Sequence, residues 1–136
     1  TLDQLNAAQA ALDPVVFRRA RHIVSENART VEAKHAMDAG DAAELGRLMR
    51  GSHASLRDDF EVTNAALNAI VAIADAQPGC FGARMTGAGF GGCAVALVRE
   101  DAAQAFSEAV SAAYMAETGL NPAIYVTGAT DGANLL

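Results

Sequence analysis

The chain has 136 residues, of which 51% are hydrophobic and 5% aromatic, and its formal net charge is −6. This length suits one domain, and the acidic balance argues against a nucleic-acid or anionic-membrane surface. No apolar stretch approaches the ~20 residues of a membrane span, and no signal-peptide pattern opens the chain. Two cysteines are too few for a disulfide framework. We therefore expect a cytoplasmic domain with reduced thiols.

The first helix is predicted between Asp13 and Gly40. Asp13 is a good cap for a helix whose first position is Pro14, because the missing proline N–H does no harm there. Gly40 provides the stop. Apolar residues recur between these ends at helical spacing, including Val16, Ala20, Ile23 and Val31.

Two more helices are predicted before residue 80. Asp41 and Glu44 resemble a capping box at the start of one, and Thr63 is the predicted cap of the other, which Pro78 and Gly79 end. The buried stripes are predicted at Leu45, Leu48, Met49, Leu56 and Phe60 in the second helix, and at Leu67, Ile70, Val71 and Ala74 in the third.

The periodicity changes in the second half. Residues 82–86 and 93–98 are predicted strands, 101–117 a helix closed by Gly119, and 122–127 a last strand followed by a tail that begins at Asp131. The order of three helices, a hairpin, a helix and a strand indicates the α+β class, with helices on one face of a small sheet. We find no repeat or linker, which favours a single domain over residues 1–136.

Four of the six residues 87–92 are glycine. Such a cluster indicates positive φ angles or a backbone that closely approaches a phosphate or another loop. The spacing of Gly87, Gly89 and Gly92 matches the dinucleotide fingerprint, but no helix is predicted after it. The only lysine, Lys34, lies upstream, so the protein-kinase hairpin and the P-loop are excluded.

We interpret residues 86–92 as a hairpin loop whose backbone binds an anion or braces a neighbouring phosphate-binding loop. The alternative is a plain tight hairpin, which needs only about one or two glycines. Arg84 lies on the strand that leads into the loop. It either faces a phosphate or points to solvent.

A second dense cluster occupies residues 52–61. Asp58 and Asp59 have the chemistry of a general base or of Mg²⁺ ligands. Adjacent helical residues point about 100° apart, so the two are poorly placed to share one metal ion. We therefore predict ion pairs for both, and a structural hydrogen bond for His53.

A polar stripe on the first helix has two interpretations, a phosphate-binding stripe or a solvated, salt-bridged surface. The flanking Glu26 and Glu32 favour the salt-bridged surface. The stripe consists of Arg18, Arg21, His22, Ser25 and Arg29. The three histidines His22, His35 and His53 show no metal-ligand spacing with the cysteines.

Three segments carry a resemblance to a known family. The segment 82–93, Gly-Ala-Arg-Met-Thr-Gly-Ala-Gly-Phe-Gly-Gly-Cys, resembles the third signature motif of the GHMP small-molecule kinases, in the form that galactokinases carry. The segment 52–62, Ser-His-Ala-Ser-Leu-Arg-Asp-Asp-Phe-Glu-Val, resembles the galactokinase helix upstream of that motif. The segment 19–27 resembles another stretch of the family, and the resemblance runs through the chain in the same order.

The resemblance implies a ferredoxin-like C-terminal domain of a GHMP kinase, with helices packed on one face of a small, mainly antiparallel sheet. The full enzyme would transfer the γ-phosphoryl group of ATP, with Mg, to the anomeric hydroxyl of galactose. Arg84 is a candidate to face a phosphate, and this chain supplies no assigned catalytic residue or metal ligand. The resemblance also implies that the loop residues line the nucleotide site. These residues are Thr86, Gly87, Ala88, Gly89, Phe90, Gly91 and Gly92.

The same resemblance implies a partner for the chain. The family's Gly-Glu-His and Pro-x-Gly-x-Gly-x-Ser-Ser-Ser motifs do not occur here. An N-terminal kinase domain of the same protein would therefore supply them, with galactose and ATP bound in the joint cleft, and the fragment alone would be inactive. We expect the surface that this domain covers to be apolar, so that the isolated chain tends to form homodimers.

Other functions are compatible with these motifs. A non-catalytic galactose and ATP sensor and an N-acetylgalactosamine kinase share the fold, although the residues 58–60, Asp-Asp-Phe, favour galactokinase over both. A free-standing interaction module is a further alternative. Asn68 stands where galactokinases usually carry aspartate, a change that is expected to alter a local ion pair or hydrogen bond.

Overall fold

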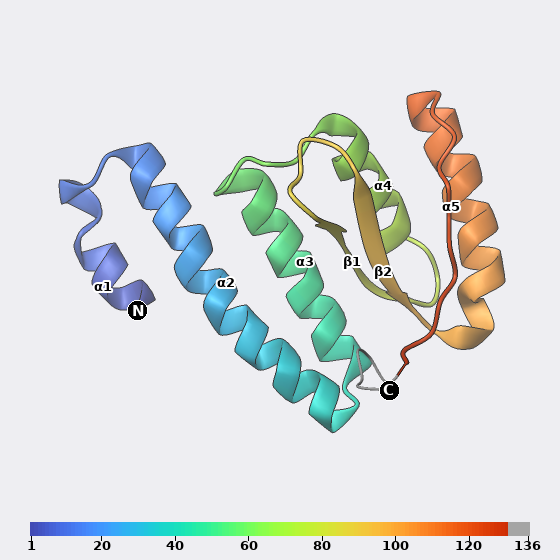
Figure 1. Cartoon of the computed structure of the whole chain (residues 1–136), viewed down its shortest axis with the longest axis horizontal. Helices are drawn as coiled ribbons and strands as arrows, with labels where there is room; N and C mark the ends of the chain where they lie inside the picture. The colour runs from blue at the N-terminus through green and yellow to red at the C-terminus, as the bar shows by residue number, and fades with distance from the viewer. Residues whose placement is uncertain (131–136) are drawn as a thin grey trace, which may run out of the picture.

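The computed structural model describes residues 1–130 and confirms the α+β class. Five α-helices and a two-stranded sheet make up this part of the chain (Figure 1). Short 3₁₀ turns, η1 (Gln9–Ala11) and η2 (Glu100–Ala102), follow the first helix and precede the last. The main elements are α1 (Leu2–Ala7), α2 (Pro14–Ala39), α3 (Ala42–Asp58), α4 (Ala65–Asp75), β1 (Cys80–Thr86), β2 (Cys93–Val98) and α5 (Ala103–Thr118).

Capping residues in the sequence explain most of the helix ends. The Asp13 carboxylate accepts from the Val15 amide at 2.8 Å and opens α2, and Gly40 ends that helix at a φ of 68°. The predicted cap of α4 was wrong by one residue, because the Asn64 side chain, not Thr63, accepts from the Leu67 amide at 2.8 Å. Helix α1 was not predicted.

The sheet is an antiparallel hairpin. Residues of β1 pair with β2 in the register Ala83–Ala96, Arg84–Val95 and Met85–Ala94. Helices α3 and α4 pack against β1, and α5 packs against α4 on the far side of the hairpin (Figure 1). The small sheet therefore has helices on its core-facing side, as the pattern predicted.

Two buried clusters form the core. One lies between α4, α5 and β1, and the other joins α3 and α4 to β1 beneath the glycine-rich loop. Met85 is fully buried in the second cluster, so the strand that leads into the loop is firmly held. The first cluster contains Val71, Ile73, Ala74, Ala83, Val110 and Tyr114, and the second contains Leu56, Leu67 and Met85.

The predicted last strand, 122–127, is wrong. No strand is assigned after Val98 in the described residues, and the segment instead runs beside α5 (Figure 1). Pro122 and Ile124 line a shallow groove together with residues of α5. Its alternating apolar pattern suits a strand, but a strand also needs a neighbouring backbone to pair with. The predicted tail from Asp131 lies outside the described residues.

The apolar positions predicted on α2 do not face the core. Val16, Ile23 and Val31 are each about half exposed, whereas Phe17, His22 and Ala36 are buried against the neighbouring structure. Among the longer helices, α2 packs mainly on α3 (Figure 1). Its exposed apolar side chains form an open face. None of the helices within residues 1–130 has both the length and the apolar character of a membrane span.

Candidate functional site

The glycine-rich loop between β1 and β2 has an unusual backbone. Four of its glycines, Gly87, Gly89, Gly91 and Gly92, have φ angles of 83°, 86°, 152° and 101°. Phe90 also has a positive φ, 60°, and its side chain is 73% exposed. This backbone explains the need for glycine, because other residues rarely adopt such angles.

The loop presents backbone amides to its surroundings. Among the described residues, only the Phe90 amide of residues 87–92 donates to a protein acceptor. Apart from the adjacent residues, no atom lies within 4 Å of the position that a Cβ on Gly87 or Gly92 would take, so the backbone is open at both. Successive N–H groups in an open, positive-φ loop form a concave site for an anion.

The loop is also anchored at one point. The Phe90 amide donates to the Val62 carbonyl oxygen at 2.7 Å, and the Asn64 side chain donates to the Phe90 carbonyl at 3.1 Å. A Cβ on Gly89 would overlap the Val62 carbonyl oxygen. Glycine is thus required at residue 89 by close approach as well as by its φ angle.

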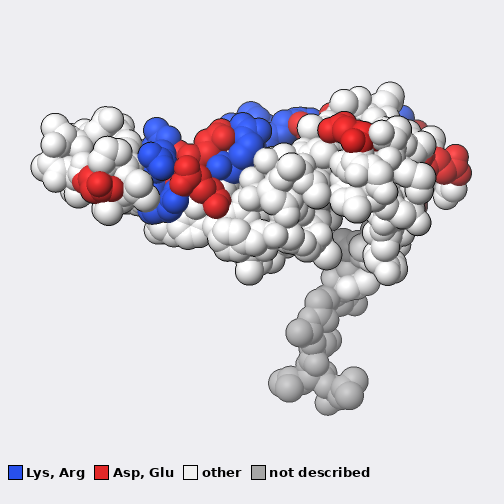
Figure 2. Space-filling view, turned by 90° about the horizontal axis from the view of Figure 1, so that it is seen from above, with Lys and Arg blue, Asp and Glu red and all other residues white. Residues whose placement is uncertain are grey.

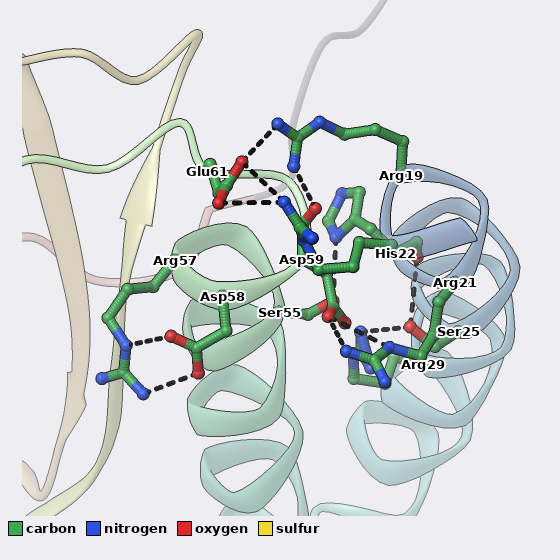
Figure 3. A network of polar contacts seen from close by, with 11 residues as sticks. Arg19, Arg21, His22, Ser25, Arg29, Ser55, Arg57, Asp58, Asp59 and Glu61 are labelled. Carbon is green, nitrogen blue, oxygen red and sulfur yellow. Dashed lines mark hydrogen bonds and ion pairs between the residues drawn. The ribbon is translucent and has the colours of Figure 1, made fainter. Parts of the chain in front are cut away.

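The anchoring segment, residues 59–64 between α3 and α4, is held in turn by α2 (Figure 3). The Arg21 guanidinium pairs with the Asp59 carboxylate, and Arg18 and Arg19 pair with Glu61 at 3.3 and 2.5 Å. The ion pair predicted for Asp59 is confirmed, as is that of Asp58 with Arg57 at 2.7 Å.

The polar stripe on α2 is salt-bridged, as predicted, and Arg18 and Arg21 remain partly exposed, but His22 does not lie at a solvated surface. His22 is buried, its Nδ1 lies 3.0 Å from the Ser55 hydroxyl, and its ring stacks on Phe60 with centroids 4.5 Å apart. Burial lowers the pKa of His22. Within the stripe, His22 and Arg21 have partners at the C-terminal end of α3, whereas Arg29 pairs with Glu26 of α2 itself.

Arg84 points toward α2. Its Nη1 lies 3.4 Å from Glu26, and its Nε donates to the Met85 carbonyl at 3.0 Å. Burial opposes ionisation of Glu26, but hydrogen bonds from Ser52 and Arg29 outweigh it and lower the pKa of the carboxyl group. Arg84 therefore already has a partner, and a contact with phosphate remains a prediction.

His53 makes the predicted structural hydrogen bond. The Met85 amide donates to His53 Nδ1 at 3.2 Å and so ties α3 to the strand that enters the loop. Burial and the nearby Arg57 lower the pKa of His53. The Nδ1 atom of His53 is therefore a structural acceptor in the folded chain.

Two comparisons place this architecture among known proteins. A family described as "GHMP kinases C terminal" matches residues 33–116, which is more than half of the chain. The chain belongs to the GHMP kinase family. The match covers α3, α4, both strands with the glycine-rich loop between them, and nearly all of α5.

A solved structure gives the second comparison. The structure described as Lactococcus lactis galactokinase complexed with galactose is 44% identical, with a TM-score of 0.85. The alignment covers 89% of this chain but 31% of that galactokinase. The chain therefore spans about a third of the length of the relative it matches, and the resemblance in sequence motifs is confirmed as a relationship of fold and family.

Sequence reasoning found the loop but missed its anchors. Val62 acts through its backbone carbonyl, so its side chain carries no signal for this contact. Asn64 was adjacent to the predicted cap, and its second role, donating to Phe90, depends on a long-range approach of two loops. The positive φ of Glu61, 58°, was likewise invisible in the sequence, since glutamate is unusual there.

Proposed function

We propose that the chain is the C-terminal part of a galactokinase and that its loop, residues 86–92, lines the nucleotide site. The full enzyme would transfer the γ-phosphoryl group of ATP to the anomeric hydroxyl of galactose. The observation that carries the proposal is the open, positive-φ backbone of the loop, in which every amide of residues 87–92 except that of Phe90 has no protein acceptor among the described residues. The identity of 44% to a galactokinase supports the choice of sugar.

The chemistry of the loop suits a supporting role. Backbone N–H groups stabilise negative charge on phosphate oxygens without reorganising, and phosphoryl transfer depends chiefly on positioning and on such charge stabilisation. The loop contains no lysine or arginine. It therefore completes a site whose main phosphate anchor belongs to the N-terminal kinase domain of the full enzyme.

The described residues do not fit a magnesium site. No group of three or more His, Cys, Asp or Glu in residues 1–130 is arranged to hold a metal ion. Asp58 and Asp59 are both engaged by arginines. No step assigned to this chain therefore runs through the metal ion that accompanies ATP.

The apolar surface supports a missing partner domain. Val16, Ile23 and Val31 on α2 and Val95 on β2 are exposed. Figure 2 shows charged side chains gathered in part of the visible surface, with large areas free of charge. The exposed apolar side chains suit contact with the N-terminal kinase domain. We expect the isolated chain to be inactive, because that domain supplies the main phosphate anchor.

A Gly89 variant tests the nucleotide role. In the full-length enzyme, Gly89→Val should raise the KM for ATP by about tenfold, or lower kcat by a similar factor, which corresponds to ~1.4 kcal/mol. Gly40→Ala is the matched control, because Gly40 has a φ of 68° with open space around it and lies far from the loop in sequence. Kinetics of Gly89→Val that match those of Gly40→Ala in folded protein would contradict the proposal.

A further inference from the structure

The connector between α3 and α4, residues 59–64, links α2 to the glycine-rich loop. It receives contacts from α2 at residues 59, 60 and 61 and passes contacts to the loop from Val62 and Asn64. Figure 3 shows Arg19 and Glu61 at one end of this network and Arg21 with Asp59 at the other. Because it concerns the loop, this inference rests on the proposed nucleotide site.

Arg19 spans the connector. Its Nη1 donates to the Asp59 carbonyl oxygen, and its Nη2 donates to Glu61 Oε2 at 2.5 Å. Arg18 reaches the other oxygen of Glu61 at 3.3 Å. One guanidinium thus fixes the backbone on one side of Phe60 and the side chain on the other, a geometry for which the planar arginine fork is suited.

Backbone strain lies on both sides of the contact with the loop. In residues 1–130, the non-glycine residues with positive φ are Glu61, at 58°, and Phe90, at 60°. The hydrogen bond from the Phe90 amide to Val62 lies next to both. Left-handed conformations at such residues persist only where the surroundings fix them, and they gather at functional sites. Backbone hydrogen bonds from Phe60 to Ser55 and from Val62 to Leu56 hold the residues on either side of Glu61. Arg18 and Arg19 hold the Glu61 side chain itself.

The ordinary alternative is a surface ion pair with no further role. The side chains of Arg19 and Glu61 are 33% and 48% exposed, and pairs of this kind add little to stability. The two interpretations make different predictions. A plain surface pair affects neither the loop nor nucleotide binding, whereas a brace affects both while leaving global stability nearly unchanged.

We propose that Arg19 and Glu61 are positioning residues for the nucleotide. The two side chains hold the connector in the conformation in which Val62 and Asn64 form their hydrogen bonds with Phe90. The loop amides on either side of Phe90 are then prearranged for the phosphates. Neither residue touches the nucleotide; both act through Val62 and Asn64.

Amide exchange at Phe90 in this chain tests the brace without any assay of activity. Glu61→Gln and Arg19→Gln should each speed exchange of the Phe90 amide by about three- to tenfold through local opening. Arg47→Gln is the matched control, because Arg47 also joins α3 to α2, through Glu32 at 3.8 Å, away from the connector. Exchange at Phe90 that changes equally in the control, or in none of the variants, would overturn the proposal.

Kinetics of the full-length enzyme give the second readout. Glu61→Gln should raise the KM for ATP about three- to tenfold and leave the KM for galactose within about twofold, since only the nucleotide loop is displaced. Glu61→Gly removes the ion pair but relieves the backbone strain, so it folds readily and should loosen the loop in the same way. Faster Phe90 exchange with an unchanged KM for ATP would overturn the nucleotide role of the loop, whereas unchanged exchange would overturn the brace itself.

Discussion

Gly46 in α3 lies directly against Gly82 in β1. A Cβ on Gly46 would overlap the Phe81 carbonyl oxygen, and one on Gly82 would overlap the Gly46 backbone. The two glycines therefore let a helix and a strand approach with no side chain between them, which brings the loop-bearing hairpin against α3 (Figure 1).

Gly46→Ala should destabilise the chain by about 1–3 kcal/mol, because the added methyl group forces the helix and strand apart. Helix propensity alone predicts the opposite, since alanine is favoured over glycine by about 1 kcal/mol. Gly51→Ala is the control in the same helix, where the nearest atom, Arg29 Cδ, is 3.4 Å from the new Cβ. Urea unfolding should show Gly51→Ala at or above wild-type stability; equal effects of the two would contradict the packing argument.

His53 makes stability depend on pH. Burial lowers its pKa from 6.5, so the folded state holds the neutral ring and the unfolded state binds a proton first. The contribution of the neutral His53 ring to the free energy of unfolding is therefore fully present above about pH 6.5. It is lost as the pH falls toward the pKa of His53 in the folded state. Protonating Nδ1 also removes the acceptor of the Met85 amide, a loss of about 1–3 kcal/mol.

Urea unfolding between about pH 7.5 and pH 5 measures this effect, above the range in which most carboxylates titrate. The groups around His53 are Arg57, Arg84, Asp58 and Asn68. His53→Gln should flatten the profile but not abolish it, because burial also lowers the pKa of His22. A profile with the wild-type slope would rule out His53 as the source.

Asn68→Asp restores the residue that galactokinases usually carry. Asn68 lines the same pocket as His53, and its side chain raises the pKa of the His53 ring against the effect of burial. A carboxylate there should raise the pKa of His53 further, because it stabilises the imidazolium. NMR titration of His53 should show this rise, with a weaker loss of stability on acidification; a fall in the pKa would contradict the placement.

The exposed apolar face of α2 should make the isolated chain self-associate. Val16, Ile23 and Val31 are about half exposed along one helix. We expect dimers in sedimentation and binding of a hydrophobic dye, and Ile23→Glu should reduce both while changing stability by less than about 0.5 kcal/mol. Val126→Glu is an exposed apolar control outside α2. A monomeric chain that binds no dye would contradict the expectation that the apolar face of α2 drives self-association.

The sequence predicted those features that depend on neighbouring residues. Asp13 and Pro14 predict the start of α2, which the structure confirms. The glycines of residues 87–92 predict a loop with positive φ angles, which these residues have. Features that depend on distant partners were missed. The segment 122–127 has the pattern of a strand but no partner strand in the described residues, and Val62 anchors the loop through a carbonyl that every residue type possesses.

The exposure of the apolar positions on α2 has a related reason. Apolar residues at helical spacing indicate a helix face that packs against another element or domain. Val16, Ile23 and Val31 form such a face, although it is exposed in this chain. His22 is buried because its ring has a polar partner, the Ser55 hydroxyl. Periodicity does not tell which body covers a face. On our account, the body that covers α2 is the N-terminal kinase domain.

The most direct test of the account is phosphoryl transfer from ATP, with Mg, to galactose by this chain alone and after mixing with a separately expressed N-terminal half. We predict no turnover by the chain alone and recovery on mixing, because the loop completes a site whose other groups lie in the preceding domain. Turnover by the chain alone would contradict this account and would place catalytic groups within these 136 residues.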